Sequence, residues 1–299
     1  MERKIRAAVV GYGNIGRHAV EALRAADDFE IAGIVRRKGS SPAKELSDYP
    51  VVANIDELGH VDVAILCSPT RAIKSLASDI LSKGINTVDS FDVHTEIVAL
   101  KKTLDPIAKA HNCTSIIAAG WDPGSDSIIR ALMLAMAPKG ITYTNFGPGM
   151  SMGHSVAARA IAGVKDALSI TVPVGTGVHR RLVYVELQEG AQLSEVEALL
   201  KADDYFAHDD THVKQVASVD MLKDMGHGVH LTRKGVSGET HNQLFEYSMR
   251  INNPALTSQF LVSAARATMK QVSGAYTTIE IPPIFYLSGD EEGLIRELV

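Results

Sequence analysis

Two aspartates stand where a carboxylate could do chemistry on a bound small molecule. Asp92 lies in TVDSFD and Asp122 lies in GWDPG, and each follows a short apolar run. Two carboxylates can hold a positive charge such as an ammonium group, and burial of the pair would raise the pKa of one carboxyl, which suits a general base near neutral pH. Each aspartate could also cap a helix, because Asp before a proline such as Pro123 is a common helix start. The two interpretations are compatible.

A glycine-rich turn precedes both acids. The apolar run IRAAVV ends in the pattern G-x-G-x-x-G and leads directly into a helical pattern. In a dinucleotide-binding turn the first glycine allows the tight turn, the second lets the backbone approach the pyrophosphate, and the third lets helix and strand pack closely. We therefore expect Gly11, Gly13 and Gly16 to bind a dinucleotide; the alternative is a glycine-rich turn without a ligand.

A basic turn, IVRR, ends the second apolar run. Enzymes that use NAD usually place an acid at this point, about 20 residues after the glycines, to bind the ribose hydroxyls. Arg36 and Arg37 would instead attract a 2′-phosphate. The sequence thus favours NADP over NAD, with an ordinary solvated turn as the alternative.

The pattern of elements explains how these residues come together. Strand-length apolar runs alternate with helix-length amphipathic stretches through the first 120 residues, which predicts right-handed crossovers and a parallel sheet. Ligands bind beyond the carboxyl ends of such strands, so the turns CSPT, DSFD and GWD should line one crevice. After a helix from about Ser125 to Ala137, longer alternating runs such as RRLVYVELQ and NQLFEYSMRIN indicate a mostly antiparallel sheet.

We therefore predict an α/β chain of two domains. A Rossmann-type doubly wound parallel sheet forms a dinucleotide-binding domain over residues 1–121, which the C-terminal residues 272–299 rejoin. Residues 122–271 form a second, α+β domain for substrate binding and dimerisation, and a helix starts in it at Asn253.

Composition excludes several classes of protein. The 299 residues carry a formal net charge of −5, which argues against a nucleic-acid partner. Cys67 and Cys113 lie in apolar runs, so we expect neither disulfides nor a metal cluster, and a cytoplasmic location fits. No apolar segment is long enough to predict a membrane span or a signal peptide. Histidine pairs at metal-binding spacing occur in AHDDTH and GHGVH, but hydride transfer to a nicotinamide needs no metal, so none is expected.

Seven motifs in this order resemble those of the meso-diaminopimelate dehydrogenase family: GYGNIGR, IVRR, TVDSFD, AGWDPGSDSIIR, FGPGMSMGHS, HGVH and INNP. The resemblance covers nearly the whole chain, and GWDPG and GPGxSxGHS are its most specific parts. It implies a homodimeric enzyme of lysine biosynthesis. Such an enzyme oxidises the D-configured centre of meso-2,6-diaminopimelate with NADP, releases ammonia and L-2-amino-6-oxopimelate (tetrahydrodipicolinate), and also runs in reverse.

The resemblance also implies roles for particular residues. Those expected to bind the cofactor are Gly11, Gly13, Asn14, Ile15, Gly16, Arg36, Arg37, Ser68 and Thr70. Those expected to face the reacting amino group are Asp92 and Asp122, with Trp121 and Phe146 as walls, and Met152 and Gly153 as a turn that offers backbone donors to the nearer carboxylate. Those expected at the far, L-configured end are Thr171, Arg181, His227 and Asn253.

Some alternatives stay open at this point. The base that deprotonates the ammonium is Asp92 or Asp122, acting directly or through water. The segment VPVGTGVHRR is shorter than in some members of the family, which would leave the far subsite more open. A D-amino acid dehydrogenase with a broader substrate range is therefore an alternative, as is a non-catalytic protein that senses NADP.

Overall fold

The chain divides into two compact units in the computed structural model, which describes residues 3–40, 43–223 and 226–299. Unit 1 contains residues 1–131 and 254–299, and unit 2 contains residues 132–253. The chain of unit 1 is thus interrupted by the whole of unit 2. By this division residues 122–131 and 254–271 belong with the nucleotide-binding motif, whereas the sequence pattern groups them with the second domain.

A parallel seven-stranded sheet forms the centre of unit 1, in the order β14-β6-β5-β4-β1-β2-β3. Its strands are β1 (Ile5–Val10), β2 (Phe29–Val35), β3 (Val51–Val52), β4 (Val63–Leu66), β5 (Asn86–Asp89), β6 (Thr114–Ile117) and β14 (Gly274–Thr277). The strand order reverses between β1 and β4, which is the point where doubly wound sheets bind their ligands. The predicted parallel sheet is therefore confirmed.

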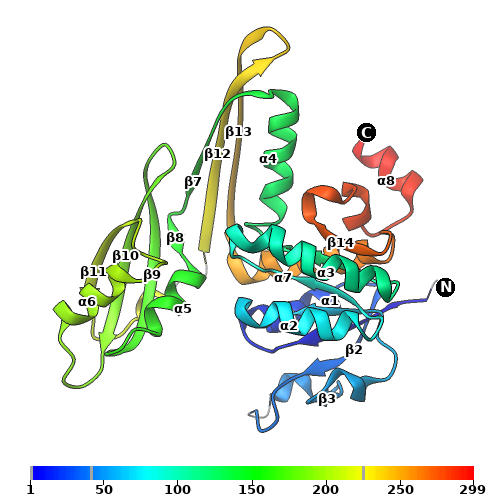
Figure 1. The fold of residues 1–299 in the computed structure, drawn as a ribbon, viewed down its shortest axis with the longest axis horizontal. Coiled ribbons are helices and arrows are strands. Elements are labelled where there is room, and N and C mark those ends of the chain that lie inside the picture. The colour runs from blue at the N-terminus through cyan, green and yellow to red at the C-terminus, as the bar shows by residue number, and fades with distance from the viewer. Residues whose placement is uncertain (1–2, 41–42, 224–225) are drawn as a thin grey trace. The chain divides into compact units, whose positions relative to one another are not determined.

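Helices cover both faces of this sheet (Figure 1). They are α1 (Asn14–Arg24), α2 (Thr70–Leu81), α3 (Ile97–Ala110) and α7 (Asn253–Thr268). A further helix, α8 (Glu291–Leu298), has no buried residue. Ala7 and Val9 of β1 pack with α1 and α7, whereas Ala8 and Val10 pack with α2 and α3. Because β1 is buried on both faces, its sequence IRAAVV is nearly continuous in apolar residues rather than alternating.

Unit 2 contains two sheets. The first, of order β11-β10-β9-β8, consists of β8 (Gly149–Met150), β9 (Val164–Gly175), β10 (Val178–Leu187) and β11 (Asp210–Gln215). The second, of order β13-β12-β7, consists of β7 (Lys139–Phe146), β12 (Gly226–Ser237) and β13 (Thr240–Asn252). All paired strands of unit 2 are antiparallel except β10 and β11. The prediction of a mostly antiparallel arrangement is therefore confirmed, although the strands form two sheets.

The described residues also contain the α-helices α4 (Ser125–Met136), whose residues belong partly to each unit, and α5 (Met152–Arg159) and α6 (Leu193–Ala202) of unit 2. The expected helix after the GWDPG motif is thus present as α4. In the described residues, no helix is both long enough and apolar enough to cross a membrane.

Candidate active site

The glycine-rich turn after β1 has the geometry of a nucleotide-binding loop. Gly11 has a φ of +99°, and a Cβ there would lie 2.5 Å from the carbonyl oxygen of Cys67. A Cβ on Gly16 would lie 2.2 Å from the carbonyl oxygen of Gly11, so turn and helix require two glycines to approach this closely. A Cβ on Gly13 would have no atom within 4 Å, which leaves open space beside the backbone.

Helix α1 starts just after Gly13, with Asn14 and Ile15 in its first turn. The first N–H groups of a helix lack acceptors within it, and such a terminus favours a phosphate group. The open space at Gly13 and this helix terminus together fit a pyrophosphate.

Arg36 and Arg37 follow β2 directly. The guanidinium carbon of Arg36 lies 5.4 Å from the centre of the Tyr12 ring, and that of Arg17 lies 5.8 Å from the same ring. Arg37 is exposed. Cation–π contacts of this kind orient a guanidinium without using its hydrogen-bond donors. Two arginines therefore stand beside the nucleotide-binding turn, one of them stacked on an aromatic ring.

The turns after β4 and β5 bring a predicted cofactor residue and a predicted base together. Thr70 is the first residue of α2, and its hydroxyl donates a 2.6 Å hydrogen bond to Oδ1 of Asp92. Asp92 is exposed. Ser68, on the same turn as Thr70, donates from its hydroxyl to the carbonyl of Val10 at 3.2 Å, which ties this turn to the end of β1.

The GWDPG segment follows β6 and leads into α4. Trp121 is 8% exposed, and the side chain of Asp122 is 10% exposed. The helix begins at Ser125 rather than at Pro123, so the Asp-Pro pair does not occupy the first turn that its sequence predicts. The carboxylate of Asp122 instead accepts a 2.9 Å hydrogen bond from Nη1 of Arg130.

A third acid beside Asp122 is absent from the sequence predictions. Nη2 of Arg130 lies 3.0 Å from Oδ2 of Asp126, whose side chain is fully buried. Burial, and secondly the negative charge of Asp122, raises the pKa of Asp126 to about 8. Asp126 is therefore mostly protonated at neutral pH. The spacing of Asp126 and Arg130, four positions apart on α4, is the signal that could have found this pair, because residues four apart on a helix are neighbours.

In unit 2, the short strand β8 brings together residues predicted for the far end of the substrate. Gly149 pairs with Thr171 of β9, and Thr171 pairs with Arg181 of β10. On its other side, a Cβ on Gly149 would lie 2.7 Å from the Cα of His227. Thr171 and Arg181 thus lie on paired strands, and His227 lies on the other side of β8, where only a glycine fits at position 149.

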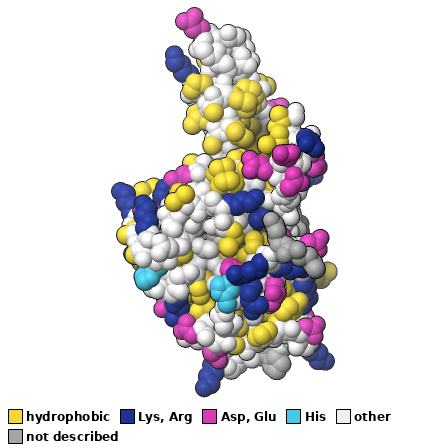
Figure 2. Space-filling view, turned by 90° about the vertical axis from the view of Figure 1, so that its right-hand side faces the viewer, with side chains coloured by type: hydrophobic (Ala, Val, Ile, Leu, Met, Phe, Trp, Pro, Cys, Tyr) yellow, Lys and Arg dark blue, Asp and Glu magenta, His cyan; other side chains and the backbone are white. Residues whose placement is uncertain are grey.

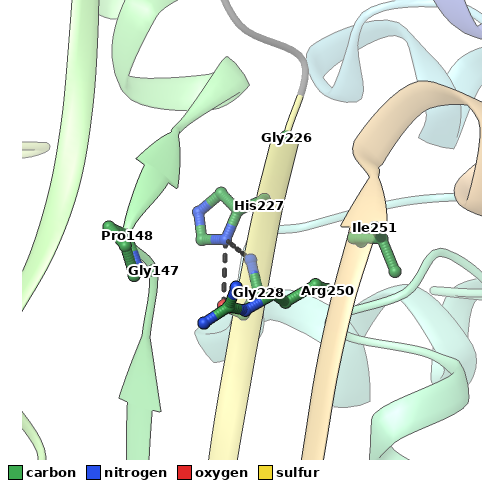
Figure 3. A pocket seen from close by; sticks show the side chains of 7 residues that line it. All are labelled: Gly147, Pro148, Gly226, His227, Gly228, Arg250 and Ile251. Atoms are coloured by element: carbon green, nitrogen blue, oxygen red, sulfur yellow. Dashed lines mark hydrogen bonds between the residues drawn. The ribbon is translucent and has the colours of Figure 1, made fainter.

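A cavity of about 250 Å³ lies at this point, and His227 is one of its walls (Figure 3). It is lined by Gly147, Pro148, Gly226, His227, Gly228, Arg250 and Ile251. Figure 3 shows the His227 ring between β12 and the segment that contains Gly147 and Pro148. Its Nδ1 accepts a 2.7 Å hydrogen bond from the backbone N–H of Gly228. Arg250, a residue that the sequence reasoning missed, reaches this cavity from β13.

The other residues predicted for the substrate occupy three further places in unit 2. Asn253 is 9% exposed and follows the end of β13, where Asn252 pairs with Gly226. The backbone N–H of Phe146 donates to Nε2 of His179 at 2.7 Å. Met152 and Gly153 are the first two residues of helix α5 rather than a turn, and the first turn of a helix leaves its N–H groups available as donors.

Arg181 and Arg180 point to opposite faces of β10, as the alternation of RRLVYVELQ predicts. Arg181 is 14% exposed and shares its face with the buried Val183 and Val185, whereas Arg180 is 44% exposed. The Nε of Arg181 lies 2.6 Å from Oδ2 of Asp209, and its Nη1 donates to the hydroxyl of Thr171. Asp209 is another residue that the sequence reasoning missed.

A dinucleotide-binding turn at the switch point of a doubly wound parallel sheet, with acids at neighbouring strand ends, defines an oxidoreductase that uses NAD or NADP. Residues 5–91 match the model of an oxidoreductase family with an NAD-binding Rossmann fold. Residues 120–253 match that of the diaminopimelic acid dehydrogenase C-terminal domain. The chain belongs to the meso-diaminopimelate D-dehydrogenase family, since it is 65% identical over 299 residues to that enzyme of Bacteroides fragilis, covering 99% of this chain and 100% of the relative.

Solved structures agree with this assignment. The diaminopimelate dehydrogenase of C. glutamicum in complex with diaminopimelate is 29% identical, with a TM-score of 0.91 over 100% of both chains. An engineered D-amino acid dehydrogenase bound to NADP+ is 27% identical, with a TM-score of 0.87 over 99% of this chain and 100% of that one.

Proposed function

We propose that this protein catalyses the reversible, NADP-dependent oxidative deamination of the D-configured centre of meso-2,6-diaminopimelate, in lysine biosynthesis. The products are L-2-amino-6-oxopimelate and ammonia. The observation that carries the proposal is the full-length membership of the meso-diaminopimelate D-dehydrogenase family. The substrate has a zwitterionic amino acid group at each end, so each end offers an ammonium and a carboxylate.

The residues of the glycine-rich turn would hold the pyrophosphate, and Ser68 and Thr70 the neighbouring ribose and phosphate. Arg36 and Arg37 would hold a 2′-phosphate, because two guanidiniums form charge-assisted hydrogen bonds with it. The open backbone at Gly13 and the cation–π contact that orients Arg36 support this assignment. When bound, the cofactor supplies the acceptor for a hydride from the substrate.

Deprotonation is the first task of the protein's own residues. The substrate nitrogen enters as an ammonium, and hydride cannot leave Cα until the nitrogen lone pair is free to form the imine. Asp92 or Asp122 takes this proton, directly or through a water. Water then adds to the iminium carbon, and ammonia leaves as the C–N bond breaks.

Each candidate base accepts a hydrogen bond from a different neighbour. Thr70 donates to Asp92, and Arg130 donates to Asp122. Because Asp126 is mostly protonated at neutral pH, Arg130 balances chiefly the charge of Asp122. In both cases a donor fixes the position of the carboxylate and stabilises its ionised form, which is the form that can accept a proton.

Trp121 would form an apolar wall on the side of the reacting carbon, and Phe146 would form another. Met152 and Gly153 would donate backbone N–H groups to the nearer carboxylate, as the N-terminus of α5 allows. At the L-configured end, Arg181, Thr171, His227 and Asn253 would bind the far carboxylate. The contact from Arg181 to the Thr171 hydroxyl and the position of His227 across Gly149 support grouping these residues as one subsite.

The direct test is an absorbance assay at the NADPH band. Purified protein is mixed with NADP and meso-diaminopimelate, and in separate reactions with L,L-diaminopimelate, with D-alanine and with NAD in place of NADP. We expect NADPH to form rapidly only with meso-diaminopimelate and NADP. A faster reaction with D-alanine would favour a broad D-amino acid dehydrogenase, and no reaction with any substrate would contradict the proposed function.

We also propose that the protein acts as a homodimer in the cytoplasm. Large apolar side chains of unit 2 that are about half exposed include Leu132, Leu134, Met136, Ile141 and Leu244. Figure 2 shows hydrophobic side chains in the upper part of the view. The β12–β13 hairpin lies at the same height in Figure 1. Exposed apolar patches commonly mark an interface between subunits. The free thiols of Cys67 and Cys113 fit a reducing compartment.

A further inference from the structure

Arg181 already has an acidic partner within its own subsite. Its Nε lies 2.6 Å from Oδ2 of Asp209, and its Nη1 donates to the hydroxyl of Thr171. A guanidinium has two edges, and each can offer a pair of N–H groups to a carboxylate. In Arg181 the Nε of one edge contacts Asp209, and Nη1 of the other edge donates to Thr171. A carboxylate that binds Arg181 must therefore share the guanidinium with Asp209 or displace it.

The charge of this subsite is balanced. Arg181 and Asp209 contribute one positive and one negative charge. His154 lies nearby, with its Nε2 3.8 Å from the same Oδ2 of Asp209. Burial, and secondly the positive charge of Arg181, lowers the pKa of His154 to about 4, so the ring is neutral at pH 7. This group of three side chains therefore carries no net charge.

A balanced pair suits one kind of ligand better than another. A lone carboxylate would be bound best by a subsite with a net positive charge. An amino acid head group carries an ammonium and a carboxylate on one carbon, and it is complementary to an arginine and an aspartate whose charged groups touch. Asp209 is accessible to such a ligand, since its side chain is 26% exposed.

We propose that Asp209 accepts the ammonium of the L-configured end of the substrate while Arg181 binds the carboxylate on the same carbon. Asp209 is then a specificity-determining residue: the ion pair between Asp209 and Arg181 opens to admit a zwitterion. Each of the two charged groups exchanges its protein partner for an oppositely charged group of the substrate. The inference rests on the proposed function, in which Arg181 binds this end of diaminopimelate.

The same strand pair offers a matched control. Arg180 of β10 pairs with Asp210 of β11, with Nε of the arginine 2.7 Å from Oδ2 of the aspartate. The side chains are 44% and 45% exposed, and they lie on the other face of β10 from Arg181. Asp210→Asn therefore removes the same charge, one residue away, from a chemically identical pair outside the subsite.

The test compares Asp209→Asn and Asp210→Asn on two substrates with a D-configured reacting centre. One is meso-diaminopimelate; the other is D-2-aminopimelate, which keeps the far carboxylate but lacks the far ammonium. Asparagine has the size of aspartate and can still accept a hydrogen bond from Arg181. For Asp209→Asn we expect the kcat/KM for meso-diaminopimelate to fall about tenfold or more, as for a lost charge-assisted hydrogen bond. The fall should reside mainly in KM, and the value for D-2-aminopimelate should stay within about twofold of wild type.

Other outcomes overturn the role of Asp209. An equal loss with both substrates would mean that Asp209 only orients Arg181. A lower KM for both would mean that it competes with the far carboxylate, and no change, or the same change in Asp210→Asn, would mean that it has no part in recognition. Failure of the proposed function gives a different result, since wild-type protein would then not oxidise meso-diaminopimelate with NADP.

Discussion

Arg130 donates a 2.9 Å hydrogen bond to the carboxylate of Asp122 from two helical turns further along α4. Arg130 lies within α4, so Asp122, which lies in the segment before the helix, is held by a hydrogen bond from a regular element. The same guanidinium contacts Asp126. Asp122, which is proposed to bind the substrate ammonium, thus shares Arg130 with a second, buried acid, Asp126.

Replacing Asp126 by Asn should make the protein more stable at neutral and mildly basic pH. The pKa of Asp126 is raised to about 8 in the folded protein from 3.8, so the folded state holds a proton that the unfolded state releases between these values. The free energy of unfolding therefore falls as pH rises from about 4 to about 8, and the loss is complete above pH 8. Asn cannot ionise, so Asp126→Asn should lack this loss.

The measurement is the Tm of wild type and variant between pH 5 and pH 8.5. We expect the variant to melt about 2 °C or more above wild type at pH 8, with a smaller gap at pH 5. Asp79→Asn, which changes a 67% exposed acid, is the control and should show no such trend. A constant difference in Tm between variant and wild type from pH 5 to pH 8.5 would show that Asp126 does not titrate in this pH range.

Replacing either candidate base by Asn should reduce turnover and leave NADP binding intact. General-base assistance is normally worth roughly 10² to 10⁴ in rate, whereas neither Asp92 nor Asp122 is proposed to contact the phosphates. Steady-state kcat and the Kd for NADP from calorimetry separate the two effects. If Asp92→Asn and Asp122→Asn both keep more than about a third of wild-type kcat, neither carboxylate is the base.

NADP should be preferred over NAD at least about tenfold in kcat/KM, because charge-assisted hydrogen bonds to the 2′-phosphate are each worth roughly 1.5 to 3 kcal/mol. Arg36→Ala and Arg37→Ala should each reduce this preference and affect the kinetics with NAD little. Lys38→Ala removes an equal charge from the next exposed position and serves as the control. Equal kcat/KM for the two cofactors in wild type would contradict the assignment of the IVRR turn.

Arg181→Leu should raise KM for meso-diaminopimelate more than it lowers kcat. The far carboxylate lies several bonds from the reacting carbon, so its contact contributes similarly to ground and transition states. A lost contact of this kind costs about 2 to 5 kcal/mol, so kcat/KM should fall about thirtyfold or more. The ratio of kcat/KM for meso-diaminopimelate to kcat/KM for D-alanine should decrease as well. Arg180→Leu is the control, and similar behaviour of both variants would mean that Arg181 does not face the substrate.

The parallel sheet could be predicted because each of its longer strands is an apolar run between amphipathic helices. Strand β3 could not, since Val51–Val52 is too short to show a pattern. The division of unit 2 into two sheets depends on which strands pair, and alternation within a single strand carries no information on its neighbour.

The same limit applies to the candidate site. The glycine-rich turn and the GWDPG segment are local in sequence, so their residues were found. The partners of the key side chains are set by tertiary structure: Asp209 meets Arg181 only because β11 runs parallel to β10 in one register. Asp126 was within reach of sequence reasoning, because its helical spacing from Arg130 is visible in GSDSIIR.

The late position of β14 in the chain has a consequence for synthesis on the ribosome. β6 is an edge strand until β14 is made, and the buried residues Leu261 and Val262 of α7 complete the core that β1 and α1 begin. All of unit 2 emerges before these segments do. During that interval the nascent chain carries an open strand edge and an uncovered apolar face, both of which favour aggregation. We expect chains truncated after residue 253 to require chaperones or precipitate, whereas the full-length chain covers this apolar face with α7 and pairs β6 with β14.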